Sequence, residues 1–224
     1  MLRSVLSRTL GRPCSRLRCR LSTLRVVPST ADRQLALPLA FLSVNPLGNG
    51  WQDWADRFAQ RGYSSLLLDL DASVASAATS SHARLEALEQ ELLKLLRNPA
   101  TSSPFPPLLF ASEADSLVAE TYVSSHPLSA LCLVSPLPAP SAHERDPDMY
   151  PTPLTADFDY EPGFPIAVLQ EGQAPTPAPQ HRLLRDFANP EDPEDQDGLV
   201  RLLVGRRDQQ GWQQVMDWMD DNGL

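Results

Sequence analysis

The chain has 224 residues, of which 42% are hydrophobic and 21% are charged, as is typical of one globular domain with a short additional segment. It has no apolar run of the roughly 18 residues that a transmembrane helix needs, so we expect no transmembrane segment. Its cysteines, Cys14, Cys19 and Cys132, match neither a disulfide framework nor a metal-binding spacing.

The formal charge of −9 is unevenly distributed along the chain. Residues 1–21 contain six arginines and no acidic residue, and the remainder has 13 basic and 28 acidic residues, a formal charge of −15. A body this acidic repels phosphate groups, so we expect it to bind neither nucleic acid nor anionic lipid.

The N-terminal segment has the composition of a mitochondrial transit peptide. Its arginines alternate with Leu and Ser, and the first acidic residue is Asp32. Such positive amphipathic segments are drawn toward the matrix by the membrane potential. We therefore expect residues 1–21 to be a transit peptide, cleaved after Leu21, and the mature protein to lie in the mitochondrial matrix. The alternative is a disordered basic tail that binds RNA or lipid.

The remaining sequence, which we expect to form one domain over residues 34–224, alternates buried strands with amphipathic helices. Short apolar runs predict strands at residues 36–44, 64–70, 108–110, 130–134, 164–170 and 199–204. Apolar positions at helical spacing predict helices at residues 51–61, 82–97, 116–125, 180–187 and 212–220. This alternation predicts an α/β fold, with a mainly parallel central sheet and helices on both of its faces.

Residues 135–163 differ from the rest of the domain because they contain seven prolines among charged residues. This composition predicts an irregular excursion and no sizeable cap domain. The only glycine-rich turn, Gly48-Asn49-Gly50, is too short for a phosphate loop. We find no sequence signature of a metal, nucleotide or flavin site and expect no cofactor.

Three segments resemble the α/β-hydrolase superfamily. Residues 42–48, followed by 51–69, resemble its first strand, oxyanion loop, helix and second strand. Residues 108–119, ending in Ser125-His126-Pro127, resemble the strand, nucleophile turn and helix of the G-x-S-x-G motif. Residues 131–136 resemble the strand that follows. This resemblance implies an α/β-hydrolase-like fold over at least residues 36–136.

The resemblance also shows that the catalytic positions are changed. The register set by residues 116–119 puts Glu113 at the nucleophile position and replaces the outer glycines of the motif by Ala111 and Asp115. We expect the backbone strain of the turn to be relaxed and Glu113 to be a solvated carboxylate at a helix N-terminus. Ser112 is the fallback nucleophile, although we expect it to be the helix N-cap.

The other two positions of the triad are changed as well. The acid position falls at residues 170–173, where Gln173 fits the family spacing and Glu171 could serve. The histidine position falls at residues 205–208, and no histidine follows His181. His143 and His181 could approach the site, but we expect both to be exposed to solvent.

Three changed positions predict that no catalytic residue remains. We therefore expect a catalytically degenerate α/β-hydrolase-fold protein of mitochondria that binds a protein partner or a small molecule. One alternative is an active ester or thioester hydrolase with a rearranged site. Another alternative is a subunit of a larger mitochondrial assembly.

Overall fold

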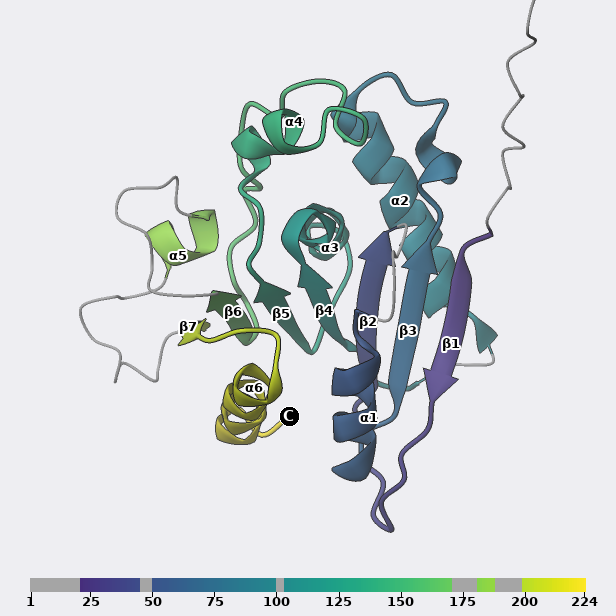
Figure 1. Ribbon diagram of the computed structural model, residues 1–224, viewed down its shortest axis with the longest axis vertical. Coiled ribbons are helices and arrows are strands. Elements are labelled where there is room, and N and C mark those ends of the chain that lie inside the picture. Colours follow the sequence, from purple (N-terminus) through teal and green to yellow (C-terminus); the bar gives the residue numbers. More distant parts are fainter. Residues whose placement is uncertain (1–20, 45–49, 100–102, 171–180, 188–198) are drawn as a thin grey trace, which may run out of the picture.

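The computed structural model describes residues 21–44, 50–99, 103–170, 181–187 and 199–224, and its centre is a seven-stranded sheet (Figure 1). The strand order is β1-β3-β2-β4-β5-β6-β7, and every neighbouring pair is parallel except β1 with β3. The strands are β1 (Thr23–Val27), β2 (Leu39–Val44), β3 (Ser65–Leu70), β4 (Leu108–Ser112), β5 (Ala130–Val134), β6 (Ile166–Gln170) and β7 (Val200–Val204).

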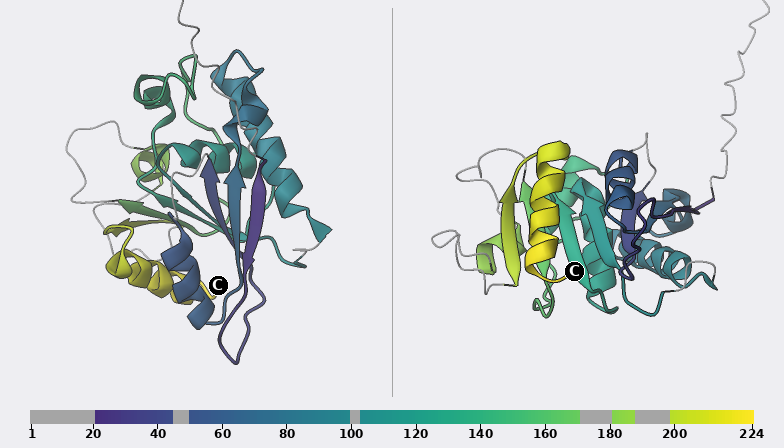
Figure 2. Two further views of the ribbon diagram at one scale, coloured as in Figure 1. Left: turned by 45° about the vertical axis from the view of Figure 1, so that its right-hand side comes forward. Right: turned by 90° about the horizontal axis from the view of Figure 1, so that it is seen from below.

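Helices cover both faces of this sheet, as Figure 2 shows. One face packs against α1 and α6, and the other packs against α2, α3 and α5. The helices are α1 (Gln52–Gln60), α2 (Ser81–Leu96), α3 (Ser116–Val123), α5 (Arg182–Asp186) and α6 (Gln209–Asp221). The predicted fold class is confirmed.

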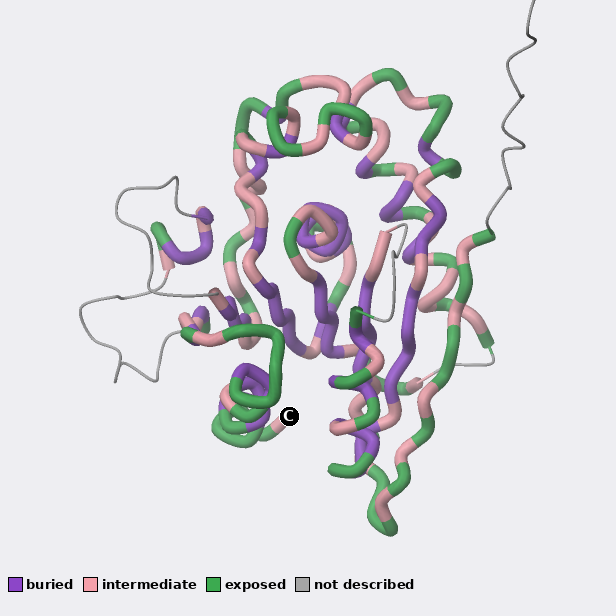
Figure 3. Tube along the Cα trace, viewed as in Figure 1, coloured by how far each residue is buried: buried purple, intermediate pink, exposed green. Residues whose placement is uncertain are grey.

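Strand alternation divides the interior into two hydrophobic cores. On β2, Leu39 and Phe41 enter the core beneath α1 and α6, whereas Ala40 and Leu42 enter the core beneath α2 and α3. The rings of Phe41 and Phe110 stack with centroids 4.5 Å apart and join β2 to β4. Figure 3 shows that this pair of strands is buried along most of its length.

The predicted strands and helices are all present, with ends that differ by at most three residues. Ser80 caps α2, because its hydroxyl accepts a hydrogen bond from the Ala83 amide at 3.3 Å. β1 was not predicted, and it adds an edge strand to the sheet before residue 34, the expected start of the domain.

The proline-rich excursion contains only two short helical segments, η4 (Ala139–Ser141) and α4 (Ala142–Arg145). It lies beyond the carboxyl ends of the parallel strands, at the upper end of Figure 1, and forms no sizeable cap. In the part of the chain that the structure describes, no helix is long and apolar enough to span a membrane.

Candidate functional site

The side of the sheet on which successive strands are added reverses at β2. A ligand is expected at such a switch point. From β2 the chain passes through α1 to β3 on one side, and then through α2 to β4 on the other. In open α/β sheets, the crevice at the carboxyl ends of such strands is the usual ligand site. Val44 ends β2 and Ser112 ends β4, so both lie at this crevice.

A tight corner follows β4 and connects it to α3. A single turn of 3-10 helix, η3 (Glu113–Asp115), makes this corner, and Glu113 has a φ of +49°. The expected relaxation of backbone strain is therefore wrong. The Glu113 carbonyl accepts hydrogen bonds from the Ser116 hydroxyl at 2.5 Å and from the Leu137 amide at 3.2 Å. Because these bonds fix the peptide group from two elements, they stabilise a φ that a residue with a Cβ rarely adopts.

The corner presents Glu113 to solvent, as predicted. Its carboxylate has no ion-pair partner among the residues that the structure describes. Ser112 begins the turn, but its hydroxyl makes no capping hydrogen bond, so the prediction that it caps the helix is wrong. Instead the Ser112 hydroxyl accepts a hydrogen bond from the Arg207 guanidinium at 3.3 Å.

Arg207 stands after the last strand, in the segment where the resemblance places the catalytic histidine. Its guanidinium carbon lies 4.9 Å from the centroid of the Trp51 ring, a cation–π contact. The Trp51 indole is itself fixed, because it donates a hydrogen bond to the Leu42 carbonyl at 2.9 Å. The Trp51 ring is buried, so it belongs to the core and presents only its upper face to Arg207.

The loop that carries Arg207 is anchored to α6. The Asp208 carboxylate caps that helix by accepting hydrogen bonds from the Gln210 and Gly211 amides at 2.9 and 3.1 Å. A Cβ at Gly211 would lie 1.9 Å from the Arg206 carbonyl oxygen, so the close approach of loop and helix requires glycine. Local sequence thus fixes the loop that carries Arg207 against the start of α6.

Asp115 replaces the last glycine of the family motif, and its carboxylate accepts a hydrogen bond from the Val44 backbone amide. Burial raises the pKa of Asp115, and the nearby Glu113 carboxylate adds to this rise, whereas the Val44 amide and the Arg207 guanidinium lower it. The net effect moves the pKa from 3.8 to about 7. Asp115 therefore links the corner to the end of β2. Its burial at the crevice disfavours the ionised carboxylate.

A cavity of about 530 Å³ lies above the corner, between it and the proline-rich excursion. The Tyr150 hydroxyl donates a hydrogen bond to the Ala114 carbonyl at 2.8 Å and connects the excursion to the corner. Arg84 of α2 holds the excursion through the carbonyls of Asp148 and Met149. The lining residues are Val44, Ala72, Arg84, Ser112, Glu113, Ala114, Asp115, Asp146, Asp148, Met149 and Tyr150.

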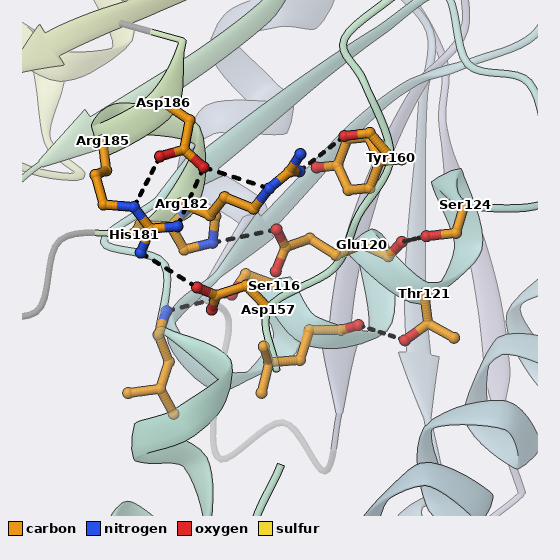
Figure 4. A network of polar contacts seen from close by, with 12 residues as sticks. Ser116, Glu120, Thr121, Ser124, Asp157, Tyr160, His181, Arg182, Arg185 and Asp186 are labelled. Carbon is orange, nitrogen blue, oxygen red and sulfur yellow. Dashed lines mark hydrogen bonds and ion pairs between the residues drawn. The ribbon is translucent and has the colours of Figure 1, made fainter. Parts of the chain in front are cut away.

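Neither candidate histidine reaches the corner. The His143 Nδ1 atom lies 2.6 Å from the Tyr150 carbonyl oxygen. His181 is buried beside α3, with its Nε2 atom 3.2 Å from a Glu120 carboxylate oxygen, so the prediction that it is exposed is wrong (Figure 4). Among the described residues, no imidazole lies within hydrogen-bond distance of Ser112 or Glu113.

His181 belongs to a polar network that fastens α5 to α3 and to the excursion (Figure 4). Arg182 donates a hydrogen bond to the Tyr160 carbonyl at 2.8 Å, and Arg185 pairs with Asp157 at 3.5 Å. Both groups of the Glu120–His181 pair are about 95% buried, so the pair has a structural role away from the cavity.

Three groups of the predicted site lie outside the described residues: Asn45-Pro46 with Leu47, Glu171, and Gln173. Within the described part, the corner unites Ser112, Glu113 and Ala114 as the resemblance implied. Arg84 and Tyr150 were not predicted to belong to the site. No sequence motif marks either residue, since Arg84 lies on a helix and Tyr150 lies within the proline-rich excursion.

No protein-family model matches the chain, and no curated protein sequence matches it. Solved structures do match over most of its length. A cold-adapted esterase from an Arctic intertidal metagenomic library has a TM-score of 0.55 and 12% identity, over 90% of this chain and 94% of that one. An α/β hydrolase from lagoon sediment of Mar Chica, Morocco, has a TM-score of 0.51 and 12% identity, over 91% and 96%.

A monoglyceride lipase from Saccharomyces cerevisiae gives a TM-score of 0.51 and 11% identity, over 88% of this chain and 89% of that one. These proteins are similar to the chain in fold, whereas their sequences differ at nearly nine positions in ten. The chain therefore has the α/β-hydrolase fold, and the resemblance of its three sequence segments is confirmed at the level of the fold.

The positive φ at Glu113 predicts that glycine is more stable than alanine at this position, which is the reverse of their order within a helix. We expect Glu113→Gly to be more stable than Glu113→Ala by about 1 kcal/mol, because only glycine adopts this φ without strain. At the exposed Glu86 on α2, glycine should instead be less stable than alanine by about 1 kcal/mol. Urea unfolding of the four variants measures both differences, and the same order at both positions would contradict a strained corner.

The raised pKa of Asp115 predicts a pH-dependent stability. Because the folded state holds this proton more tightly than the unfolded chain, its contribution is complete below about pH 4 and is lost as the pH rises through about 7. Asp115→Asn should therefore be more stable than the parent protein at about pH 8 and should lack this loss. Urea unfolding at about pH 5 and pH 8 measures it, and Glu86→Gln is the control for removing a carboxylate. Equal pH dependence in parent and Asp115→Asn proteins would contradict the assignment.

Proposed function

We propose that this chain is a non-hydrolytic mitochondrial protein of the α/β-hydrolase fold, which binds a small ligand in the cavity above its former nucleophile corner. The observation that carries the proposal is the pair of side chains at the corner. Glu113 stands at the nucleophile position, and Arg207, from the segment where the resemblance places a histidine, donates a hydrogen bond to the adjacent Ser112 hydroxyl.

Acyl transfer requires a base that takes the proton of the nucleophile and returns it to the leaving group. A guanidinium group has five N–H donors and no acceptor, so Arg207 cannot be this base. An acyl group transferred to Glu113 would form an anhydride, and its hydrolysis would need a base to activate water. The described residues supply no imidazole there, which supports a site without turnover.

The local charge also opposes hydrolysis. Ester hydrolysis develops negative charge on the carbonyl oxygen, and hydrolases stabilise it with amide groups directed at that oxygen. Here the Ala114 amide lies between two acidic residues, Glu113 and Asp115. Their carboxylates repel an oxyanion, so the corner would raise the barrier that its counterpart in a hydrolase lowers.

The cavity supports ligand binding as the role that remains. Its volume of about 530 Å³ falls within the range of small-molecule sites. The carbonyl bonds at Glu113 and the Tyr150–Ala114 bond keep its walls in one arrangement. A binding site needs such a preformed shape, whereas the loss of proton-transfer groups does not affect it.

The proposal predicts that the purified protein hydrolyses neither p-nitrophenyl acetate nor acetyl-CoA above the rate of heat-denatured protein. Loss of the triad in hydrolases lowers kcat by factors on the order of 10⁴ to 10⁶. A fluorophosphonate probe should likewise leave the protein unlabelled.

The outcome that overturns the proposal is hydrolysis that falls at least about tenfold in Ser112→Ala or Glu113→Gln. Ser125→Ala is the matched control, since Ser125 is an exposed serine beyond the end of α3. Activity that survives all three substitutions would indicate a contaminant.

Mitochondrial import is the second part of the proposal, and the fold supports the predicted cleavage after Leu21. The first strand begins at Thr23, so removal of residues 1–21 leaves every described element in place. Cleavage at this point removes the six arginines of the segment and leaves the acidic remainder of the protein.

We expect the radiolabelled precursor to be shortened and protease-protected in isolated mitochondria, and an uncoupler should abolish both changes. Replacing Arg3, Arg8 and Arg12 by Glu should also abolish them. The control replaces three exposed arginines of the body, Arg33, Arg145 and Arg206, and should import normally. Import that resists the N-terminal substitutions would contradict the assignment.

A further inference from the structure

We propose that the protein has a second ligand site, at the edge of the sheet opposite to the corner, and that this site binds an apolar molecule that ends in a carboxylate. The site is a cavity of about 310 Å³ at the amino ends of β2, β4 and β5. Arg97 and the Tyr122 hydroxyl bind the carboxylate, and the hydrocarbon part of the ligand fills the cavity. The inference goes beyond the proposed function, which concerns the corner cavity alone.

The walls of this cavity come from the amino edge of the sheet and from the ends of two helices. Its lining includes five prolines, three leucines and Phe105. Pro38 and Pro107 directly precede β2 and β4, and α2 and α3 both end beside them. Figure 1 shows these strand starts at its lower end, whereas the corner lies at the opposite ends of the strands. Such a lining suits a hydrocarbon group.

Hydrogen bonds between neighbouring strand starts hold these walls in place. The Leu108 amide donates to the Pro38 carbonyl at 3.0 Å, so the segment before β2 is fixed to β4. Ser129 binds the carbonyls of Pro106 and Pro107 at 2.6 and 3.0 Å and fixes the segment before β4 to the start of β5. Because the walls have this shape before a ligand arrives, binding pays little for ordering them.

The Tyr122 hydroxyl is a buried polar group that the cavity leaves without a partner. Tyr122 is 5% exposed and lines the cavity, and among the described residues its hydroxyl has no hydrogen-bond partner. The hydroxyl of Tyr150, which is buried as well, does donate a hydrogen bond, to the Ala114 carbonyl. Buried polar groups nearly always have a partner, so the Tyr122 hydroxyl indicates where a polar atom of the ligand binds.

Arg97 places a positive charge beside this hydroxyl. Burial raises the pKa of Tyr122, and the Arg97 guanidinium opposes this rise, so the two polar groups lie near each other. The Arg97 side chain is exposed at the end of α2, and among the described residues it has no ion-pair partner within 4.0 Å. A guanidinium offers two parallel N–H donors that match the two oxygens of a carboxylate.

The negative charge near the cavity is already bound to other groups. No acidic residue lines the cavity in the described part of the chain. The Glu89 carboxylate, which adds to the rise in the pKa of Tyr122, accepts a hydrogen bond from the Gln90 amide at 2.9 Å. Its other oxygen lies 2.7 Å from the Nε2 atom of His126. The cavity therefore combines apolar walls with unpaired donors, which favours an acid over an amine.

The experiment is calorimetric titration of the full protein with 3-phenylpropanoate, and with 3-phenylpropanamide as the neutral probe of similar shape. We expect the acid to bind at least about tenfold more tightly, because its hydrogen bonds to Arg97 and Tyr122 are charge-assisted. The cationic probe, 3-phenylpropylamine, should bind more weakly than the amide, since the Arg97 guanidinium repels it.

Variants separate the polar contacts from the apolar ones. Arg97→Gln should weaken the acid about tenfold and the amide less than about twofold. Tyr122→Phe removes only the unpartnered hydroxyl, so it should weaken the acid about fivefold and leave the urea midpoint of unfolding unchanged. Phe105→Ala should weaken both probes alike, by about threefold, since it removes apolar contact area. Arg145→Gln is the matched control, because this exposed arginine lies on α4, beyond the opposite edge of the sheet.

A short peptide that ends in a free phenylalanine carboxylate, titrated in parallel, identifies the source of the acid. Tighter binding of the peptide assigns the carboxylate to a protein C-terminus, and tighter binding of 3-phenylpropanoate assigns it to a free acid. Equal binding of acid and amide would overturn the inference. Acid binding that both Arg97→Gln and Tyr122→Phe leave unchanged would also overturn it, as would failure of every probe to bind. These outcomes do not concern the corner cavity, so the proposed function is tested separately.

Discussion

The tight corner between β4 and α3 is the constraint on which the rest of the site depends. Its carbonyl at Glu113 accepts hydrogen bonds from α3 and from the chain after β5, and these bonds maintain a positive φ in a residue with a long side chain. The backbone thus keeps the geometry that presents a side chain at the sheet edge. The group presented here is the Glu113 carboxylate, and the Arg207 guanidinium bonds to the adjacent Ser112 hydroxyl.

The residues that build the fold are different from the residues that line the site. The two strands next to the corner, β2 and β4, consist almost entirely of buried apolar residues, and the stacked Phe41 and Phe110 rings join them. The polar groups of the site, Ser112, Glu113 and Arg207, by contrast, lie on two short segments at the carboxyl edge. Substituting them costs little folding free energy, so a fold of this kind can lose hydrolysis and retain a shaped cavity.

Much of the fold was predictable because its strands are short apolar runs and its helices have clear apolar faces. β1 was missed because its residues are largely exposed at the sheet edge, so they show no buried pattern. The burial of His181 was also missed, since it depends on Glu120, which lies far away in sequence. The corner could be placed from the register of residues 116–119, whereas the contact of Arg207 with Ser112 spans 95 residues and leaves no local pattern.

Asp115 shows how one side chain can change the chemistry of the corner between β4 and α3. A glycine at this position leaves the end of β2 free to approach the corner, but the Asp115 carboxylate occupies that space and binds the Val44 amide. The segment after β2 is then tied to an ionisable group whose charge is costly at neutral pH. Any cation in the cavity would offset that cost, and any anion would increase it. A carboxylate at this position therefore disfavours the developing oxyanion that a hydrolase stabilises at its nucleophile turn.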